Sequence, residues 1–208
     1  GVIRSLTSSI WQTKLRNNLM KIVRVSDKGI DPSGMKTAGD VGRELEVKVD
    51  RVLSKYFKSV YEGVYEVSYN NPFKSLINHN EDRHDYNSQY FEDSLKDVGI
   101  VPDHIIVNKV TGNKLVLESK NQDGWGNAYE RMYKFCTPNI SRLLRKVLDT
   151  DINPVAFVCS GSLCDPRFVR KIEANLGTDY DYLFWDKSEE TLIKFFEEQL
   201  KPKLEGEG

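Results

Sequence analysis

Residues 102–131 read PDHIIVNKVTGNKLVLESKNQDGWGNAYER, and the first half of this stretch decides the fold. Two β-rich runs, HIIVNKV and KLVLESK, flank Thr111-Gly112-Asn113, a sequence typical of a tight turn. The pattern predicts an antiparallel hairpin. A turn centred on Gly112 would place Asp103 opposite residues 120–122.

The open end of this hairpin gathers two acids and a lysine. Glu118 and Lys120 share one face of their strand because side chains alternate with a period of two, and Asp103 lies within about one diagonal step of both. Two close carboxylates repel each other unless a cation lies between them or one is protonated. A hard divalent ion such as Mg²⁺ prefers oxygen ligands and can activate a phosphodiester for hydrolysis. The cluster therefore predicts a metal-dependent nuclease site.

An ordinary surface pair is the alternative for this cluster. Cross-strand acid–lysine pairs are common, and Glu46-Val47-Lys48 repeats the Glu-x-Lys pattern with no Pro-Asp before it. The pattern of acids and lysine alone leaves both interpretations open.

The segment GNAYERMYKF, residues 126–135, predicts an amphipathic helix. At helical spacing one face carries Asn127, Glu130, Arg131 and Lys134, and another carries Ala128, Met132 and Phe135. Asparagine can pair with adenine and arginine can donate to a purine N7 in the major groove, so this helix could read DNA bases. A solvated charged face is the plainer alternative.

The remaining chain predicts alternating helices and strands, which indicates the α/β class. We expect helices over residues 6–24, 43–59, 89–98, 137–149, 165–176 and 188–200, and strands over 61–69, 154–161 and 181–185. Residues 26–42 and 70–88 are polar or glycine-rich and predict loops. A single domain of residues 1–208 is expected, with an N-terminal helical part (1–60), a nuclease core (100–200) and a disordered tail (201–208).

The composition is that of a globular protein, and the cysteine usage indicates a reducing compartment. The 208 residues are 39% hydrophobic and 29% charged, and the formal net charge is −1, so any DNA contact must come from local basic patches. Cys136, Cys159 and Cys164 predict buried free thiols rather than a disulfide framework; a zinc site with His79 and His84 fits no common spacing. No apolar run approaches the roughly 20 residues of a membrane span, and we expect a soluble cytoplasmic protein.

The ordered combination of Pro102-Asp103, Glu118-Ser119-Lys120 and Gly126-Asn127-Ala128-Tyr129-Glu130-Arg131 resembles type II restriction endonucleases of the EcoRI and MunI kind. The version here is most similar to the MunI branch, and the clear resemblance covers residues 101–145. It implies a restriction-endonuclease-like core, a mixed central β-sheet flanked by α-helices.

The resemblance also implies roles for individual residues. Asp103, Glu118 and the Ser119 carbonyl would hold Mg²⁺, and Lys120 would be the third catalytic residue. A central AATT would be read by Gly126, Asn127, Ala128, Glu130 and Arg131. The family acts as a homodimer on palindromic double-stranded DNA, leaves four-base 5′ overhangs and is accompanied by a cognate methyltransferase.

This chain departs from the family in the link between its two motifs. Only five residues, Asn121 to Trp125, separate Lys120 from Gly126, and relatives carry longer insertions there. Trp125 stands where relatives of the MunI kind have an arginine directed at the flanking base pair, and an indole with one donor cannot make a bidentate contact. We therefore expect this segment to read the outer base pair weakly or not at all. The loops at 26–42 or 70–88 could read it instead.

Additional contacts and two other functions stay open. Lys134, Arg142 and Arg145 are candidates for phosphate contacts, and one of Glu44, Glu46 and Asp50 is a candidate for an additional acid near the metal. The alternatives are a repair or recombination nuclease without sequence preference and a DNA-binding module without catalysis. The base-reading face argues against the first, and the complete acid–lysine set argues against the second.

Overall fold

The computed structural model describes residues 38–69, 95, 99–124 and 126–206. The chain divides into two compact units, residues 1–44 and 45–208, and of the first only 38–44 are described. The predictions for residues 6–24, 26–37 and 70–88, and those for Trp125 and most of 89–98, lie outside the described residues. The loop predicted to reach residue 42 was wrong at its end, because α2 (Ala38–Val60) already begins at Ala38.

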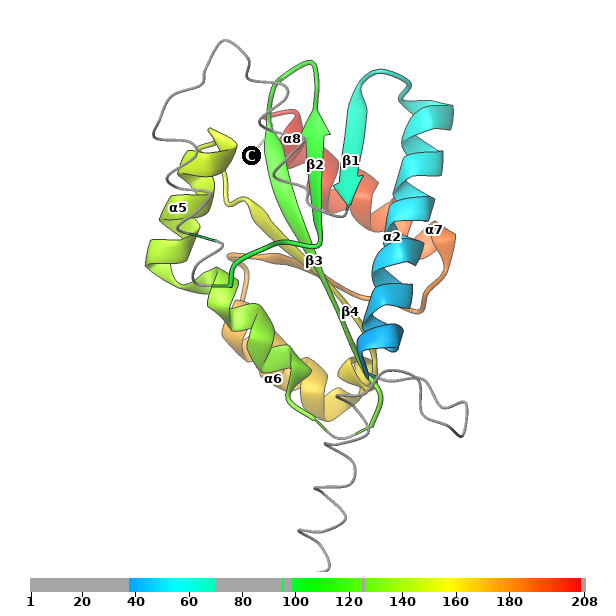
Figure 1. Ribbon diagram of the computed structural model, residues 1–208, viewed down its shortest axis with the longest axis vertical. Helices are drawn as coiled ribbons and strands as arrows, with labels where there is room; N and C mark the ends of the chain where they lie inside the picture. Colours follow the sequence, from blue (N-terminus) through cyan, green and yellow to red (C-terminus); the bar gives the residue numbers. More distant parts are fainter. Residues whose placement is uncertain (1–37, 70–94, 96–98, 125, 207–208) are drawn as a thin grey trace, which may run out of the picture. The chain divides into compact units, whose positions relative to one another are not determined.

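Five strands form one mixed sheet in the order in which they occur in the chain (Figure 1). They are β1 (Tyr65–Tyr69), β2 (His104–Asn108), β3 (Lys114–Gln122), β4 (Val155–Gly161) and β5 (Asp181–Phe184). Pairing is antiparallel from β1 to β3 and parallel from β3 to β5. The α/β class and the mixed central sheet are confirmed.

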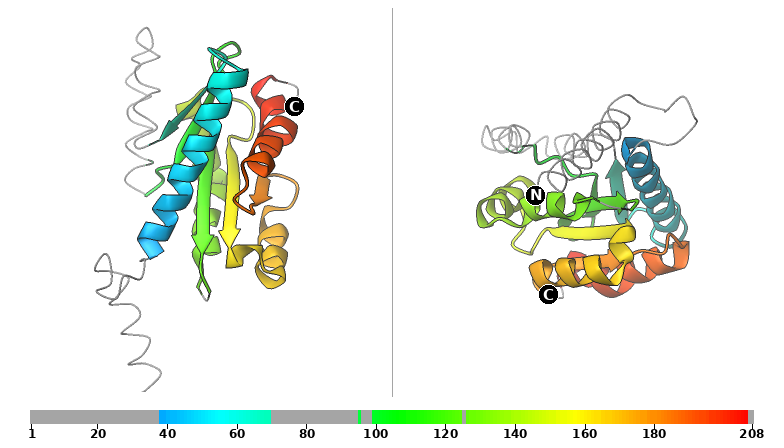
Figure 2. Two further views of the ribbon diagram at one scale, coloured as in Figure 1. Left: turned by 90° about the vertical axis from the view of Figure 1, so that its right-hand side faces the viewer. Right: turned by 90° about the horizontal axis from the view of Figure 1, so that it is seen from below.

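Helices cover both faces of this sheet, and Figures 1 and 2 show them from three sides. One face packs against α2, α7 (Glu189–Phe195), the π-helical turn Phe196–Leu200 and α8 (Lys201–Leu204). The other packs against η2 (Ala128–Cys136), α5 (Pro138–Leu148), the 3₁₀ turn η3 (Ser162–Cys164) and α6 (Pro166–Leu176). Parallel neighbours need a crossover, and η2–α5 and α6 supply the two crossovers of β3–β4–β5.

The alternation along β3 decides which side chains face which layer. Leu115 and Leu117 belong to the core beside α2 and α7, whereas Val116 belongs to the core beside η2, α5 and α6. By the same period of two, Glu118, Lys120 and Gln122 continue the face of Val116. The catalytic candidates therefore lie on the η2 side of the sheet.

The hairpin forms, but its predicted register was wrong by two residues or more. Asn108 pairs across the turn with Asn113, and the register runs to His104 opposite Leu117. One further step sets Asp103 opposite Glu118, not opposite residues 120–122. The cause is the Asn108 side chain, whose Oδ1 accepts from the Val110 and Thr111 amides at 2.9 and 3.1 Å and shapes a four-residue loop.

The expectation of a disordered tail was wrong for residues 201–206. Leu204 of α8 is fully buried, and its carbonyl accepts from the side chains of Asn108, Thr111 and Asn113 at 3.2, 2.7 and 3.1 Å. The β2–β3 turn thus satisfies the end of the last helix, which otherwise leaves unpaired carbonyls. A contact between segments about 90 residues apart is invisible in the local sequence of the tail.

The helix beginnings predicted from proline are confirmed. Thr137 caps α5 by accepting from the Ile140 amide at 3.3 Å, with Pro138 at the first helical position, and α6 begins at Pro166 after Asp165. The free thiols were predicted to be buried, which holds for Cys159, whereas Cys164 is exposed. No helix among the described residues is long and apolar enough to cross a membrane.

Candidate active site

The catalytic candidates lie where β3 continues past the end of β2. Strand β2 pairs with β3 only as far as His104, whereas β3 continues beside β4 to Gln122 opposite Gly161. Among the described residues, the Glu118–Gln122 part of β3 thus has a neighbouring strand on its β4 side only. Asp103 directly precedes β2, so the acids meet at an open edge of the sheet.

Backbone amides and Lys120 hold the two carboxylates in place. The Asp103 amide donates to Glu118 Oε2 at 3.2 Å, and the Ser119 amide donates to Asp103 Oδ2 at 2.8 Å. The Lys120 ammonium donates to Glu118 Oε1 and, at 3.1 Å, to the Ser119 carbonyl, and it lies 3.9 Å from Asp103 Oδ2. All three predicted catalytic side chains are thus brought together, and Ser119 adds its backbone carbonyl.

Burial and mutual repulsion shift the ionisation of this cluster. Burial raises the pKa of Glu118, Lys120 opposes this effect and the Asp103 charge adds to it, and the net result is a pKa of about 7. Burial also raises the pKa of Asp103, against Lys120 and the Ser119 amide. Burial alone would lower the pKa of Lys120, but the Glu118 and Asp103 charges outweigh it and raise that pKa. The lysine is therefore a cation at neutral pH.

Glu46 of α2 acts on this cluster through its charge. Its charge contributes to the raised pKa of Lys120. Its backbone carbonyl contacts His104 Nε2 at 3.1 Å, which fixes α2 to the start of β2. Asp50, one turn further on, hydrogen-bonds to Ser54 instead.

The oxygen atoms of the cluster suit a hard divalent ion. The Asp103 and Glu118 carboxylates and the Ser119 carbonyl converge on the Lys120 ammonium, so their oxygens already surround a positive charge. In the described part of the chain no three His, Cys, Asp or Glu side chains form a metal-binding group. An ion such as Mg²⁺, which keeps several waters and uses one or two carboxylates, fits this sparse set.

The segment after the link is helical, as predicted, but it forms a 3₁₀-helix rather than an α-helix. In η2 the buried residues Met132 and Phe135 are three apart, and three residues make one 3₁₀ turn. Asn127, Glu130, Arg131 and Lys134 are exposed, so the predicted division into packed and presented faces is confirmed.

The exposed residues of this segment make few contacts. Asn127 Nδ2 and the Tyr129 hydroxyl both donate to Glu130 at 3.3 Å. Among the described residues Arg131 has no hydrogen bond or ion pair, so its guanidinium is available for another molecule.

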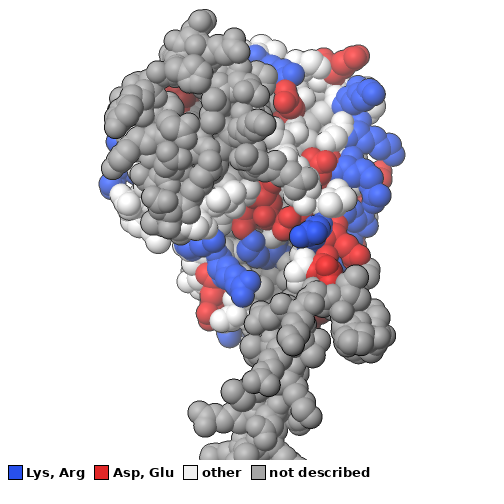
Figure 3. All heavy atoms as spheres, viewed as in Figure 1, with Lys and Arg blue, Asp and Glu red and all other residues white. Residues whose placement is uncertain are grey.

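The three candidates for phosphate contact differ in their relation to the acids. The charge of Lys134 lowers the pKa of Asp103, and its ammonium donates to the Gly99 carbonyl at 2.7 Å, so it borders the cluster. Arg142 donates to the Asn139 side chain of its own helix at 3.4 Å. The charge of Arg145 opposes the rise in the pKa of Tyr180. Among the described residues visible in Figure 3, basic and acidic side chains are interspersed.

Residue Gln122 has no place in the predicted motifs. It lies two residues beyond Lys120, is 5% exposed, and accepts from the Ala128 amide at 2.9 Å through its side chain. The alternation of β3 places Gln122 on the catalytic face, which was the available signal. Nothing in the sequence indicated that the link folds back onto it.

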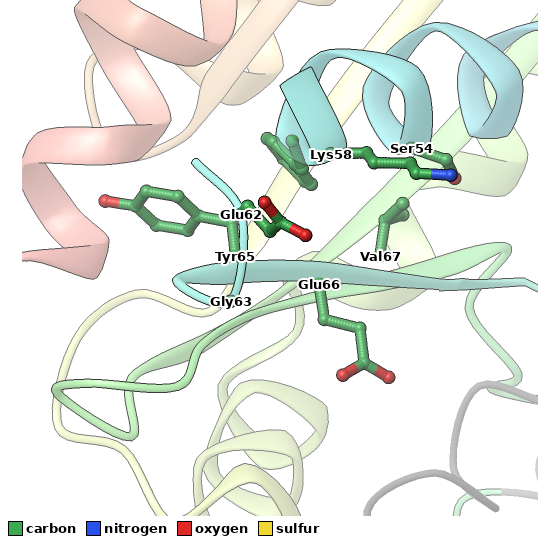
Figure 4. Close-up of a pocket in the computed structure, with 8 residues that line it drawn as sticks. Ser54, Lys58, Glu62, Gly63, Tyr65, Glu66 and Val67 are labelled. Atoms are coloured by element: carbon green, nitrogen blue, oxygen red, sulfur yellow. The ribbon is translucent and has the colours of Figure 1, made fainter. Parts of the chain in front are cut away.

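A separate hollow of about 260 Å³ lies between α2 and β1 (Figure 4). Its lining includes Ser54, Phe57 and Lys58 of α2 and Tyr65, Glu66 and Val67 of β1, and it includes neither Asp103 nor Glu118. The Glu66 carboxylate pairs with Lys109 at 2.8 Å. This hollow is distinct from the acid cluster.

A mixed sheet with two carboxylates and a lysine at an open edge, followed by an exposed polar helix, defines the class of restriction-endonuclease-like nucleases. Residues 33–205 match the family model described as Type II restriction enzyme MunI. The chain belongs to this family and is a type II site-specific deoxyribonuclease. Enzymes of this type generally use a divalent metal ion.

A solved structure supports this assignment. The chain resembles MunI restriction endonuclease, whose crystal structure was determined in complex with cognate DNA, with a TM-score of 0.52 and 25% sequence identity. The similarity covers 78% of this chain and 96% of that one. No curated protein matches this chain.

Proposed function

We propose that this enzyme cuts double-stranded DNA at a palindromic site containing AATT, uses Mg²⁺ and leaves four-base 5′ overhangs. The observation that carries the proposal is the continuity of β3 with the reading segment. Glu118 and Lys120 lie on the strand whose end leads, through a few residues, to the exposed side chains of Asn127 and Arg131. One domain would therefore both read and cut.

Lys120 acts as a cation in this proposal. Its raised pKa keeps it protonated at neutral pH, so it cannot accept a proton from water. Its ammonium, held by Glu118 and the Ser119 carbonyl, instead orients the attacking water and offsets the negative charge that develops on the phosphate.

Asp103, Glu118 and the Ser119 carbonyl would hold Mg²⁺. When bound, the ion would polarise the phosphate and lower the pKa of water. The chain contributes the placement of the oxygens. The Glu118 carboxylate accepts from the Asp103 amide, and the Asp103 carboxylate accepts from the Ser119 amide, which fixes both to the hairpin. Glu46 is a further acid whose charge reaches this cluster.

Base reading is assigned to Gly126, Asn127, Ala128, Glu130 and Arg131. Asparagine can bind adenine N6 and N7 together, and arginine can donate to a purine N7. Lys134 is assigned to a phosphate near the scissile bond because its charge acts on Asp103; Arg142 and Arg145 would contact phosphate further away. A homodimer would match the two-fold symmetry of the palindrome.

Digestion of a plasmid of known sequence tests this function. With MgCl₂ we expect fragments whose sequenced ends all lie at AATT with four-base 5′ overhangs, and with EDTA we expect no cutting. Cutting confined to one flanking pair would show a six-base site. Cutting without sequence preference would support the repair-nuclease alternative, and binding without cutting would support the DNA-binding module.

A further inference from the structure

His104, the first residue of β2, directly follows Asp103 and is fully buried. Its ring is stacked on the ring of Tyr69, with centroids 5.0 Å apart and an interplanar angle of 21°. Tyr69 is the last residue of β1, and it is also the residue that pairs with His104 in the ladder between the two strands. The stack therefore holds the start of β2 against its neighbour on the side away from β3.

The same two side chains also bind α2. His104 Nε2 lies 3.1 Å from the Glu46 carbonyl oxygen, and because a carbonyl only accepts, Nε2 carries the proton and donates. The Tyr69 hydroxyl donates to the Glu46 carboxylate at 3.2 Å. Side chains from two neighbouring strands thus bind one residue of α2, one through its backbone and the other through its carboxylate.

These contacts reach the acid cluster from behind the sheet. Ile106 belongs to the core beside α2, and by the period of two His104 shares its face. Asp103 points the other way, toward Glu118 and Lys120 on the η2 side. His104 therefore supports the cluster without lying among its side chains.

The backbone at Asp103 serves both acids. Its amide donates to the Glu118 carboxylate at 3.2 Å, and its own carboxylate accepts from the Ser119 amide at 2.8 Å. The register between β2 and β3 ends at His104 opposite Leu117, one residue before the acid. A shift of the chain at this point would move the Asp103 carboxylate and take a donor from Glu118 at the same time.

We propose that His104, assisted by Tyr69, is a positioning residue that holds the Asp103 backbone so that both carboxylates keep the geometry needed for cleavage. The buried hydrogen bond to α2 fixes the chain where the ladder with β3 stops. The inference rests on the proposed catalytic roles of Asp103 and Glu118. Neither His104 nor Tyr69 belongs to a catalytic or base-reading motif of the sequence.

The test compares two substitutions of His104 in single-turnover cleavage at saturating DNA and Mg²⁺. His104→Phe keeps a ring that can stack on Tyr69 and removes the donor to Glu46. We expect its rate to fall about 10–100-fold, because small displacements of reacting groups cost this much, with an unchanged dissociation constant for the duplex. His104→Gln has a side-chain amide that can donate to the same carbonyl, and it should cut faster than His104→Phe.

Asn108→Leu is the matched control at the opposite end of β2. Asn108 is 2% exposed, and its Nδ2 donates to the Leu204 carbonyl of α8 at 3.2 Å, much as His104 donates to a carbonyl of α2. Both substitutions should lower the free energy of unfolding, but only His104→Phe should lower the rate. Adding Mg²⁺ should also stabilise His104→Phe less than it stabilises wild type and Asn108→Leu, because the ion needs both carboxylates in place.

The outcomes separate positioning from general damage. A wild-type rate in His104→Phe, an equal loss of rate in Asn108→Leu, or a His104→Gln variant no faster than His104→Phe overturns the inference. If His104→Phe does not fold, Tyr69→Leu takes its place, because Tyr69 is partly exposed, and an unchanged rate there overturns the inference.

Asp103→Asn is measured beside these variants to test the proposed function separately. If Asp103→Asn cuts at the wild-type rate, the proposed catalytic site fails and the inference fails with it. If Asp103→Asn is inactive and His104→Phe is fully active, only the inference fails.

Discussion

The catalytic end of the β2–β3 hairpin and the proposed reading segment from Gly126 to Arg131 are neighbours in sequence but differ in how they are held. In the first, Glu118 and Ser119 are buried, and every carboxylate has an amide or ammonium donor. In the second, Asn127 and Arg131 are exposed, and the contacts of Glu130 are both 3.3 Å long.

This difference indicates a division of labour. Hydrolysis needs groups fixed before the substrate arrives, because preorganised charges require no rearrangement during the reaction. Base reading needs donors and acceptors that can exchange their present partners for DNA. Substitutions in the first region should therefore affect cleavage rate, and those in the second should affect which DNA is bound.

The largest effect is expected from Lys120→Met. The substitution removes the cation between Glu118 and Asp103 while keeping the side-chain length, and we expect the single-turnover cleavage rate to fall about 10²–10⁴-fold. Preference for AATT over a scrambled duplex should remain in binding assays. Lys194→Met, at an exposed lysine paired with Glu198, is the control. A rate within tenfold of wild type would refute the catalytic role of Lys120.

Arg131→Ala should give the complementary result. Removing a guanidinium that makes base contacts should weaken binding to AATT by about 1–3 kcal/mol and leave the unfolding free energy unchanged. Fluorescence anisotropy at fixed salt, with AATT and scrambled duplexes, measures both affinities. An equal loss on the two duplexes would make Arg131 a phosphate contact and would remove it from the reading face.

Local sequence patterns alone predict part of the fold and of the candidate site. The hairpin, the helix beginning at Pro138 and the cluster of Asp103, Glu118 and Lys120 follow from local patterns: strand alternation, capping residues and motif order. The register did not follow, because it depends on the Asn108 side chain binding the turn amides.

Other features needed contacts between distant segments or a finer helical distinction. The spacing of Met132 and Phe135 suits an α-helix as well as a 3₁₀-helix, and only the structure distinguishes them. Leu204 is ordered by hairpin side chains far away in sequence. Gln122 could not be singled out because its partner Ala128 is brought back by a link whose path has no sequence signature.

The free energy of unfolding of the metal-free protein should depend on pH through Glu118, at the catalytic end of the hairpin. The pKa of Glu118 in the folded state, about 7, lies above its usual value of 4.5. The contribution of Glu118 to stability is therefore fully present below about pH 4.5 and is lost as the pH rises to about 7. The lowered pKa of His104, about 4, acts in the opposite direction, because stability is lost as pH falls from 6.5 towards 4. The wild-type profile therefore mixes two trends.

Comparison with Glu118→Gln isolates the first trend. The unfolding free energy of wild type minus that of the variant should decrease between pH 5 and pH 8 in urea denaturation with EDTA. Mg²⁺ should stabilise wild type more at pH 8 than at pH 5, because a cation favours the ionised carboxylate. If this difference in unfolding free energy does not change with pH, the pKa of Glu118 is not raised in the folded protein.

The smallest effect is expected from Glu130→Gln in the reading segment. Its two contacts are exposed and long, so the free energy of unfolding should change by no more than about 0.5 kcal/mol. The same substitution at Glu197 is the matched comparison, because that carboxylate accepts from the Tyr56 and Tyr61 hydroxyls at 2.7 and 2.6 Å, and we expect a loss of about 1 kcal/mol. Equal losses in urea denaturation would show that Glu130 is held as firmly as the scaffold. The reading segment would then be as fixed as the catalytic hairpin, and recognition could not depend on its freedom to exchange partners.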